Sequence, residues 1–547
     1  MKSQAFQAKA LILLIIPFVL VIGIMLPRLI APQFGLLDDA ATLARAQATL
    51  QGNFNLEHDL QAGRFRPVYW LFPTLIYLLA NSNPFWFFFG FLVIFLLLLL
   101  SIQIYMKSRG ANPWQIFLAS ILFVLSIPVI ENFYTLSKGE PLQLLFLMGS
   151  LILLEQLKKT KDPRKMWLLD IASFFCILFG LMVKETTLVM LPFALLILCL
   201  VWLMNKNDAG KIRGAQVHFT ISVGLAVLVI FALRTFTGTS SIAEGTYSYR
   251  YQFSFSSILQ QAARWTTLLA FYFHYLFVYG FTLLLTLIAS KNRREIIDDD
   301  FVFWTSWCLL WVAVLIPWEY AEAYYLLPFG TGAAILIGFT FPKLIRQISR
   351  FKSVPRGVLL GLLILSGILW GMTIPNYATH ARTQMLFDEM NAAMLDSVAE
   401  TLPKNAHLLI NIENKNEYVK MIARFLGEQY DREDITIDHV DSTRQASLND
   451  YQGAFLIVPE INHQPRLTVR AGVEERFQTP WNLKSLEIIG TDSRLIFDHS
   501  KTIRLANINL PIVLCPILGE IGFCEQPDPL LDFRLFSYGW ALYAIDS

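Results

Sequence analysis

Long apolar runs dominate this sequence, and the run from Phe85 to Leu100 contains no charged residue. A helix needs about 20 apolar residues to cross the roughly 30 Å hydrocarbon core of a bilayer. Segments of this kind lie at 10–30, 84–106, 113–131, 141–157, 166–183, 186–204, 215–235, 263–290, 301–317, 323–341 and 357–374. The pattern predicts a polytopic α-helical membrane protein with about eleven transmembrane helices.

The composition supports this interpretation and excludes other classes of protein. Hydrophobic residues make up 55% of the 547 residues, and only 16% are Asp, Glu, Lys or Arg, against about 25% in soluble domains. Soluble, disordered, collagen-like and small disulfide-scaffold classes are therefore excluded. The net charge is +2 and there is no long basic tract, so the chain carries no electrostatic footprint for nucleic acid. We expect its partners in or beside the membrane lipids.

Lysine and arginine residues gather in alternate loops between the apolar segments. They are Lys107 and Arg109; Lys158, Lys159, Lys161, Arg164 and Lys165; Lys206, Lys211 and Arg213; Lys291, Arg293 and Arg294; and Lys343, Arg346, Arg350, Lys352 and Arg356. The positive-inside rule assigns these loops to the cytoplasm, and Lys2 and Lys9 place the N-terminus there too. An odd number of spans then delivers the chain beyond residue 375 to the outside. We expect a multi-pass protein of a plasma (inner) membrane, with the first span retained as an anchor.

The composition changes after the last apolar segment. We expect residues 1–375 to form a transmembrane core with a long first outer loop at 31–83, and residues 376–547 to form an extracytoplasmic domain. Residues 406–412, 435–440 and 454–458 have the character of strands, and residues 417–430 have that of an amphipathic helix. This pattern predicts an α/β domain with a small mixed sheet.

Two of the five cysteines, Cys515 and Cys524, lie in this C-terminal domain. Outside the cytoplasm they are candidates for a disulfide, and a pair of reduced thiols is the alternative. The eight histidines show no metal-ligand spacing. The chain also has no P-loop, no GxSxG motif and no dinucleotide fingerprint, so no nucleotide cofactor is expected.

Two adjacent acids, Asp38 and Asp39, follow the first apolar segment and open an amphipathic stretch. One interpretation is structural, because an Asp at this place caps a helix and interacts favourably with its dipole. The other interpretation is catalytic. A partly desolvated carboxylate at the membrane surface could take the proton from an acceptor hydroxyl, while its neighbour orients it or holds a metal.

Three predicted outer turns carry charges at membrane depth, where charges are costly and usually functional. Their residues are Lys138 and Glu140 in the first turn, Lys184 and Glu185 in the second, and Glu319, Glu322 and Tyr325 in the third. In the structural interpretation each Lys–Glu pair neutralises itself, or the lysine extends to the interface. Three such turns on one face, beside the acidic pair, favour a site for a substrate.

Arg64 and Arg66 lie among aromatic residues just before the second apolar segment. Guanidinium groups suit phosphate through bidentate hydrogen bonds, and anchoring at the interface is the alternative. The tyrosine-rich stretch at 247–251 is more typical of an aromatic belt than of a sugar-stacking surface.

An acidic pair in the first outer loop, followed by Arg64-Phe65-Arg66-Pro67 and many spans, resembles the GT-C superfamily of membrane glycosyltransferases. The pattern is similar in particular to protein O-mannosyltransferase-like enzymes and to bacterial relatives that modify lipid A, such as aminoarabinose transferases, or envelope glycans. Lys184-Glu185 and Tyr325-Leu326-Leu327-Pro328 also resemble recurrent features of the group. The likeness covers about residues 1–375. Such families often have Glu after the first acid, whereas this chain has Asp39.

The resemblance implies a hexosyl- or pentosyltransferase that takes its sugar from a polyprenyl-phosphate donor and passes it to an envelope lipid, glycan or protein. Asp38 would act as the general base with Asp39 beside it, and the configuration at the anomeric carbon of the sugar would invert. Phosphate binding would fall to Arg64, Arg66, Lys138 and Lys184, and substrate orientation to Glu140, Glu185, Glu319, Glu322 and Tyr325. Some of these families use a divalent metal and others do not, so the metal requirement stays open.

A transporter or flippase of a lipid-linked or polar substrate is the main alternative, because acids and lysines within a membrane also relay protons or hold headgroups. That class predicts inverted repeats with broken helices near the midplane, whereas the charges here concentrate at the outer ends of spans. A non-catalytic scaffold would explain the paired charges only as structural bridges. Glycosyl transfer is the favoured hypothesis.

Overall fold

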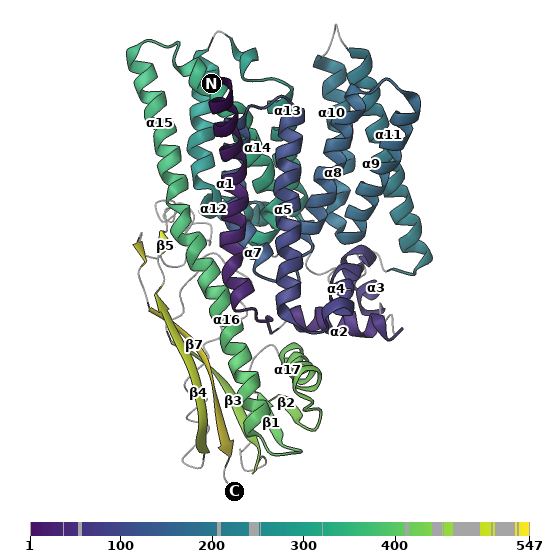
Figure 1. Cartoon of the computed structure of the whole chain (residues 1–547), viewed down its shortest axis with the longest axis vertical. Helices are drawn as coiled ribbons and strands as arrows, with labels where there is room; N and C mark the ends of the chain where they lie inside the picture. The colour runs from purple at the N-terminus through teal and green to yellow at the C-terminus, as the bar shows by residue number, and fades with distance from the viewer. Residues whose placement is uncertain are drawn as a thin grey trace.

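The computed structural model shows a bundle of long helices with a small sheet region at one end (Figure 1). It describes residues 2–36, 38–52, 57–204, 209–239, 251, 253–290, 292–319, 321–410, 415–439, 451, 453–462, 493–504, 507–508, 531–532 and 535–545. The end of the bundle beside the sheet is named the sheet-side end below, and the opposite end is named the far end.

Nine helices in the described part of the chain are long and apolar enough to span a membrane, or ten if one bent pair counts as a single span. The helices of the bundle are α1 (Lys2–Ile30), α5 (Pro84–Ser108), α6 (Pro113–Val124), α7 (Ile127–Phe133), α8 (Glu140–Lys159), α9 (Pro163–Val183), α10 (Met190–Met204), α11 (Ala209–Phe236), α12 (Phe255–Ala289), α13 (Asp299–Leu315), α14 (Leu327–Ile348) and α15 (Ser353–Gly371), with short 3-10 turns at η1 (Glu185–Val189), η3 (Arg293–Glu295) and η4 (Ala323–Leu326). The prediction of a polytopic α-helical membrane protein is confirmed. The predicted span at 301–317 is α13, which has 17 residues and is not among those nine or ten.

The third predicted span is broken into α6 and α7, which meet at an angle of 60°. Pro128 lies in the first turn of α7, where its missing N–H costs no helical hydrogen bond. In a continuous helix that N–H would have paired with the carbonyl of Val124. The Val124 carbonyl instead accepts a hydrogen bond from Tyr377 Oη at 3.2 Å, so the break is satisfied by a distant helix.

Close contacts between the helices depend on glycine. A Cβ atom built at Gly338 of α14 would lie 2.9 Å from the Cβ of Ala119 in α6, and one at Gly332 would lie 2.4 Å from Cδ1 of Trp307 in α13. Small residues are common where membrane helices approach closely. Trp307 also donates from Nε1 to the carbonyl of Pro328 at 2.8 Å. These contacts fix the start of α14, and with it the position of η4.

The predicted first outer loop contains three short helices, α2 (Asp38–Leu50), α3 (Glu57–Gln61) and α4 (Pro67–Ala80). α4 is apolar, but its 14 residues are too few to span a bilayer. These helices lie at the sheet-side end of the bundle (Figure 1). α2 packs against α4 and against α17 (Lys415–Tyr430) of the C-terminal region. The first loop and the C-terminal region therefore share one end of the bundle.

The last helix of the bundle leads directly into the sheet region. α16 (Thr373–Thr401) follows α15 and extends from the bundle along the sheet (Figure 1), so the predicted boundary between residues 375 and 376 falls in its first turn. The strands are β1 (His407–Ile410), β2 (Thr436–His439), β3 (Phe455–Asn462), β4 (Ser493–Arg504), β5 (Asn507–Ile508), β6 (Leu531–Asp532) and β7 (Leu535–Ile545). Five of them form a sheet in the order β2-β1-β3-β7-β4, parallel at β1 and antiparallel at β7. The predicted small mixed sheet and the predicted helix at 417–430 are confirmed.

Candidate active site

Charged and aromatic side chains from separate segments meet at the sheet-side end of the bundle. This sheet-side cluster comprises Arg64 and Arg66 before α4, Lys138 and Glu140 at the start of α8, Lys184 and Glu185 between α9 and α10, and Tyr324 and Tyr325 in η4. The structure therefore brings together residues from the two predicted lysine turns, the arginine segment and the third turn.

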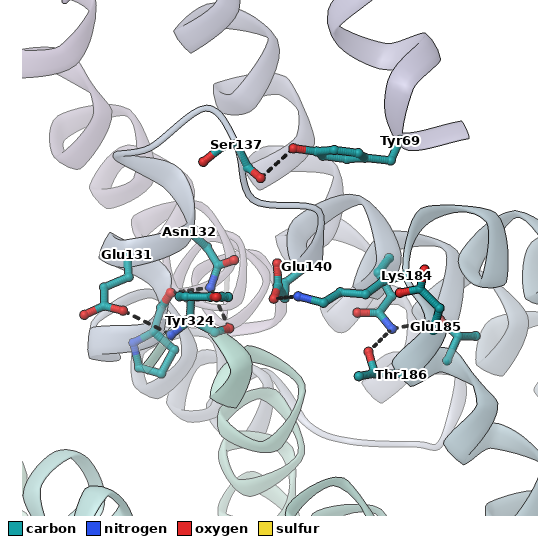
Figure 2. A network of polar contacts seen from close by, with 12 residues as sticks. Tyr69, Glu131, Asn132, Ser137, Glu140, Lys184, Glu185, Thr186 and Tyr324 are labelled. Atoms are coloured by element: carbon teal, nitrogen blue, oxygen red, sulfur yellow. Dashed lines mark hydrogen bonds and ion pairs between the residues drawn. The ribbon is translucent and has the colours of Figure 1, made fainter. Parts of the chain in front are cut away.

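Lys184 lies at the centre of the cluster, where it forms an ion pair with Glu140 (Figure 2). Only 8% of Lys184 and 2% of Glu140 is exposed. α9 ends at Val183, and the extended backbone of Lys184 turns the chain into η1. Burial lowers the pKa of Lys184 to about 8, although Glu140 opposes this shift. A desolvated lysine of this kind is stabilised in its charged form when a further anion approaches.

Two tyrosine rings cover the lysines. Lys138 Nζ lies 4.1 Å from the centre of the Tyr324 ring, and Lys184 Nζ lies 4.3 Å from the centre of the Tyr325 ring. The two rings are themselves 4.1 Å apart between centres. A cation–π contact stabilises a desolvated ammonium group without placing a carboxylate on it. The two ammonium groups therefore lie against aromatic rings, and Lys184 also pairs with the Glu140 carboxylate.

Arg66 and Glu185 form a two-pronged ion pair beside the lysines. Arg66 Nε donates to Glu185 Oε1 at 3.0 Å, and Arg66 Nη2 donates to Glu185 Oε2 at 2.5 Å. Burial lowers the pKa of Arg66, but the Glu185 carboxylate and the nearby Tyr325 and Tyr69 together raise it by more, so the net shift is upward. The guanidinium is therefore charged at all physiological pH values, and its orientation is fixed by two hydrogen bonds.

The turn that carries Arg64 needs a glycine. Gly63 has a φ of 73°, which is in the left-handed region, and its carbonyl accepts a hydrogen bond from Arg234 Nη2 of α11 at 2.9 Å. Arg64 lies close enough to Tyr325 and Glu185 to interact with both electrostatically. Arg234 is not among the predicted site residues, because an arginine at the end of a span usually indicates only an interfacial anchor.

Glu131 and Asn132 of α7 hold η4 in place (Figure 2). The Tyr324 amide donates to Glu131 Oε2 at 3.1 Å, and Asn132 Nδ2 donates to the Tyr324 carbonyl at 3.0 Å. Tyr69 of α4 fixes the turn that precedes α8, because its Oη donates to the Ser137 carbonyl at 2.5 Å. None of these residues is a predicted site residue. The bend between α6 and α7 brings Glu131 and Asn132 to η4. Pro128 is the main feature of the local sequence that indicates this bend.

Gln143 supports the turn that follows Lys184. Its Nε2 donates to Thr186 Oγ1 at 2.9 Å and to Thr187 Oγ1 at 2.8 Å. Gln143 Oε1 and Glu140 Oε2 are buried without a hydrogen-bond partner among the described residues. A buried acceptor is costly unless it binds a donor, so both oxygens suit hydroxyl groups of a ligand. Gln143 is also absent from the predicted site, because a glutamine near a span end has no distinctive signal.

The acidic pair lies at the start of α2. Asp38 is the first residue of that helix, and its side chain lies outside the described residues. Asp39 is 4% exposed, and its Oδ2 accepts a hydrogen bond from the Gly35 amide at 2.7 Å. This bond fixes the start of α2 to the segment that follows α1. Among the described residues, no group of three or more His, Cys, Asp or Glu side chains could hold a metal ion.

The remaining predicted residues are more dispersed. Glu322 precedes η4 and acts electrostatically on Tyr324, whereas the half-buried Glu319 carboxylate bonds to no other described residue. Cys515 and Cys524 lie outside the described residues. Of the stretch 247–251 only Tyr251 is described, and its ring lies 4.8 Å from the ring of Trp318.

A second charged group, the far-end group of Arg109, Glu155, Lys158 and Asp300, lies at the opposite end of the bundle. Arg109 Nε donates to Asp300 at 2.8 Å, Arg109 Nη1 donates to Glu155 at 3.2 Å, and Lys158 donates to Glu155 at 2.6 Å. A cavity of about 60 Å³ lies beside this group, and its other walls are mainly apolar. No predicted site residue lines this cavity.

No family model matches the sequence, and no curated protein matches it either. Solved structures do match the fold. ArnT from Cupriavidus metallidurans in the apo state matches with 12% identity and a TM-score of 0.45, over 83% of this chain and 93% of that chain. The same protein bound to undecaprenyl phosphate matches with 11% identity and a TM-score of 0.41, over 83% and 92% of the two chains.

The oligosaccharyltransferase of Archaeoglobus fulgidus in the apo form also matches, with 10% identity and a TM-score of 0.47, over 90% of this chain and 73% of that chain. At these TM-scores the likeness is a loose one of overall fold. The function is therefore inferred from the side chains of the site.

Proposed function

We propose that the protein transfers a sugar from a polyprenyl-phosphate-linked donor to an acceptor in the cell envelope. In this proposal the sheet-side end faces the outside of the plasma membrane, and the N-terminus lies in the cytoplasm. The acceptor is an envelope lipid, glycan or protein, and the sugar is a hexose or a pentose. No nucleotide takes part, because the donor arrives through the bilayer.

The meeting of Lys138, Lys184 and Arg66 at one end of an apolar bundle supports this proposal most strongly. Charged groups at membrane depth are expensive and usually mark a substrate site. The lysines lie against tyrosine rings, and Arg66 presents a fixed planar guanidinium. This combination of point charges and a planar donor suits a phosphate group, and a lipid-linked phosphate reaches the site along the surface of the bundle.

In the proposed reaction, Asp38 accepts the proton of the acceptor hydroxyl as the hydroxyl oxygen attacks the anomeric carbon. The new C–O bond forms opposite the breaking C–O bond, so the configuration at that carbon inverts. The polyprenyl phosphate leaves with the bonding electrons. Its additional negative charge is stabilised by Lys138, Lys184 and Arg66, with Arg64 nearby.

The carboxylates keep these cations and the sugar in place. Glu140 and Glu185 each hold one cation, and the unpartnered oxygens of Glu140 and Gln143 are available to sugar hydroxyls. Glu319, Glu322 and Tyr325 border the substrate in this proposal. Asp39 fixes the start of α2 and thereby places its neighbour Asp38.

The test is a mass profile of envelope glycolipids, glycans and glycoproteins from cells that lack the protein. The cells are complemented with the native protein, with Asp38→Asn, or with the control Arg350→Gln, at matched amounts in the membrane. Arg350 pairs with Glu295 on the surface of the far end, where their side chains are 50% and 37% exposed. We expect a sugar-sized mass to disappear in the knockout, to return with native protein and with the control, and to stay absent with Asp38→Asn.

Either of two results would overturn the proposal. An unchanged profile in the knockout would remove glycosyl transfer as the function. Full restoration by Asp38→Asn would make the acidic pair a helix cap, and transport or scaffolding would be the next hypothesis to test.

A further inference from the structure

A buried ion pair joins α16 to the end of α1. Asp388 Oδ2 lies 2.5 Å from Arg28 Nη2, and only 4% and 1% of their side chains is exposed. The same Arg28 nitrogen donates to the Tyr134 carbonyl at 2.6 Å, and the guanidinium lies 4.9 Å from the centre of the Phe88 ring. Separating such a pair leaves a buried charge without compensation, so α16 cannot easily move away from α1.

The Asp388 carboxylate also reaches the segment that precedes the acidic pair. A Cβ atom built at Gly35 would lie 3.4 Å from Asp388 Oδ1 and 3.2 Å from Asp39 Oδ2. The Gly35 amide already donates to that Asp39 oxygen. Gly35 therefore lies between the two carboxylates. Because packed interiors transmit displacements, a shift of Asp388 would move the segment that carries Asp38.

The C-terminal sheet holds α16 one helical turn beyond Asp388. Asn391 Oδ1 accepts hydrogen bonds from Tyr538 Oη and Trp540 Nε1 of β7, both at 2.9 Å. Both aromatic residues are almost fully buried. The sheet region also contacts the first loop directly, because the ring of Phe34 lies 6.2 Å from the ring of Phe425 in α17.

We propose that the C-terminal region positions the acidic pair through α16, and that Asp388 is the positioning residue. The path runs from β7 through Asn391 and along α16 to Asp388, which lies beside Gly35, and the Gly35 amide bonds to Asp39. Asp388 acts through Arg28 and Gly35 and takes no part in proton transfer. The catalytic consequence of this arrangement rests on the proposed sugar transfer, whereas the positioning itself does not.

The first experiment measures the position of the acidic pair without using activity. The five native cysteines are replaced by serine, and the reporter is Ala40→Cys, at a residue that is 1% exposed and adjacent to Asp39. Maleimide labelling of the full chain in lipid vesicles is compared with and without Asp388→Asn. The control is Glu389→Gln, because Glu389 is the next residue of α16 and pairs with Lys501 where both side chains are 48% exposed.

We expect labelling of the reporter to become about tenfold faster with Asp388→Asn, since the loosened segment opens more often. Labelling should not change with Glu389→Gln. An unchanged rate with Asp388→Asn, in protein that is monodisperse and correctly inserted, would overturn the proposal whatever reaction the protein performs.

The second experiment separates binding from transfer. Binding of undecaprenyl phosphate to purified protein, and recovery of the sugar mass in knockout cells, are measured for the same variants. Asp388→Asn should keep the affinity and lower transfer by about 10- to 100-fold, because a catalytic group displaced by about 1 Å has an effect of this size. Asp388→Glu, which keeps the charge, should recover part of the transfer.

Equal losses of binding and transfer with Asp388→Asn would also contradict the proposal, because Asp388 would then support the whole fold. If the native protein neither binds undecaprenyl phosphate nor restores a sugar mass, the proposed function is wrong. The labelling rate still decides the positioning role in that case.

Discussion

Both ends of the helix bundle hold buried charges, but the charges are compensated in different ways. At the far end, Arg109 is shared by Glu155 and Asp300, and Glu155 also pairs with Lys158. At the sheet-side end, Arg66 and Lys184 each pair with one carboxylate among the described residues, and Lys184 also lies against a tyrosine ring. Arg109 of the far-end group is therefore shared by two carboxylates, whereas Lys184 of the sheet-side cluster has one carboxylate partner and one aromatic neighbour.

This difference shows that a charge at membrane depth does not by itself indicate a binding site. The far-end group and the sheet-side cluster are both charged segments at the ends of apolar helices. What separates them is the second partner of each cation, which is a carboxylate for Arg109 and an aromatic ring for Lys184. If that distinction separates a structural ion-pair group from a substrate site, variants at the two ends should affect stability and sugar transfer differently.

The largest effect is expected for Lys184→Met. This change removes a cation that we propose to bind phosphate, and it leaves Glu140 buried without its partner. We expect transfer to fall by about 100- to 1000-fold and the free energy of unfolding to fall by about 3–5 kcal/mol. Envelope mass profiles and thermal unfolding in detergent measure the two effects.

The double variant Lys184→Met with Glu140→Leu separates the two effects. Replacing both partners by apolar residues should restore most of the stability, because no buried charge is left, while transfer stays lost. Recovery of transfer in the double variant would mean that the pair serves only the fold.

Arg109→Met should lower the stability of the protein but leave sugar transfer nearly unchanged. It leaves Glu155 and Asp300 without their shared cation, so we expect the free energy of unfolding to fall by about 3 kcal/mol. Transfer per folded molecule should stay within about twofold of native, since the far-end group takes no part in the reaction. A selective loss of transfer with normal unfolding would place the substrate at the far end.

Arg66→Lys should have a smaller effect on transfer than Lys184→Met. The lysine keeps the positive charge but loses the planar fork that donates two hydrogen bonds to Glu185. We expect transfer to fall about tenfold, with normal amounts of protein in the membrane. Arg350→Gln is the control, and an Arg66→Lys variant as active as that control would show that Arg66 is only an anchor.

A pH dependence of donor binding should accompany these effects. Because burial lowers the pKa of Lys184 to about 8, the free site loses this charge as the pH rises through that value. Binding of undecaprenyl phosphate must then take up a proton, so the affinity should fall by up to about tenfold per pH unit above about pH 8. Lys184→Arg should remove this step, and a native affinity that is constant from pH 7 to about pH 9.5 would contradict the role of Lys184.

Stability should move in the other direction over the same pH range. The pKa of Lys184 is lower in the folded protein than its ordinary value of 10.5, so the unfolded chain binds more protons between about pH 8 and 10.5. The contribution of Lys184 to the free energy of unfolding therefore rises with pH in this window.

The sequence predicted the fold in those regions where a local pattern determines the structure. Apolar length predicted the spanning helices, and alternating strand patterns predicted β1, β2 and β3 with the helix α17. The bend between α6 and α7 was not predicted, although Pro128 is a local signal for it. It depends on Tyr377, which satisfies the Val124 carbonyl from a helix about 250 residues further along the chain.

The candidate site was predictable only where its residues are unusual for their surroundings. Lys138 and Lys184 are conspicuous because charges are rare at membrane depth. Asn132 and Gln143 are not conspicuous in the sequence, because neutral amides near the ends of spans are common in helix packing. Their roles depend on which backbone or hydroxyl groups the folded chain places beside them, and no spacing in the sequence encodes that arrangement.

The phosphate site is tested most directly by binding of undecaprenyl phosphate to three purified proteins at about pH 7: the native chain, Lys184→Met with Glu140→Leu, and Arg109→Met. We expect equal affinity for the native chain and Arg109→Met, and a loss of at least about tenfold for the double variant. Equal affinity in all three proteins, or a loss confined to Arg109→Met, would contradict the assignment of the sheet-side cluster as the phosphate site.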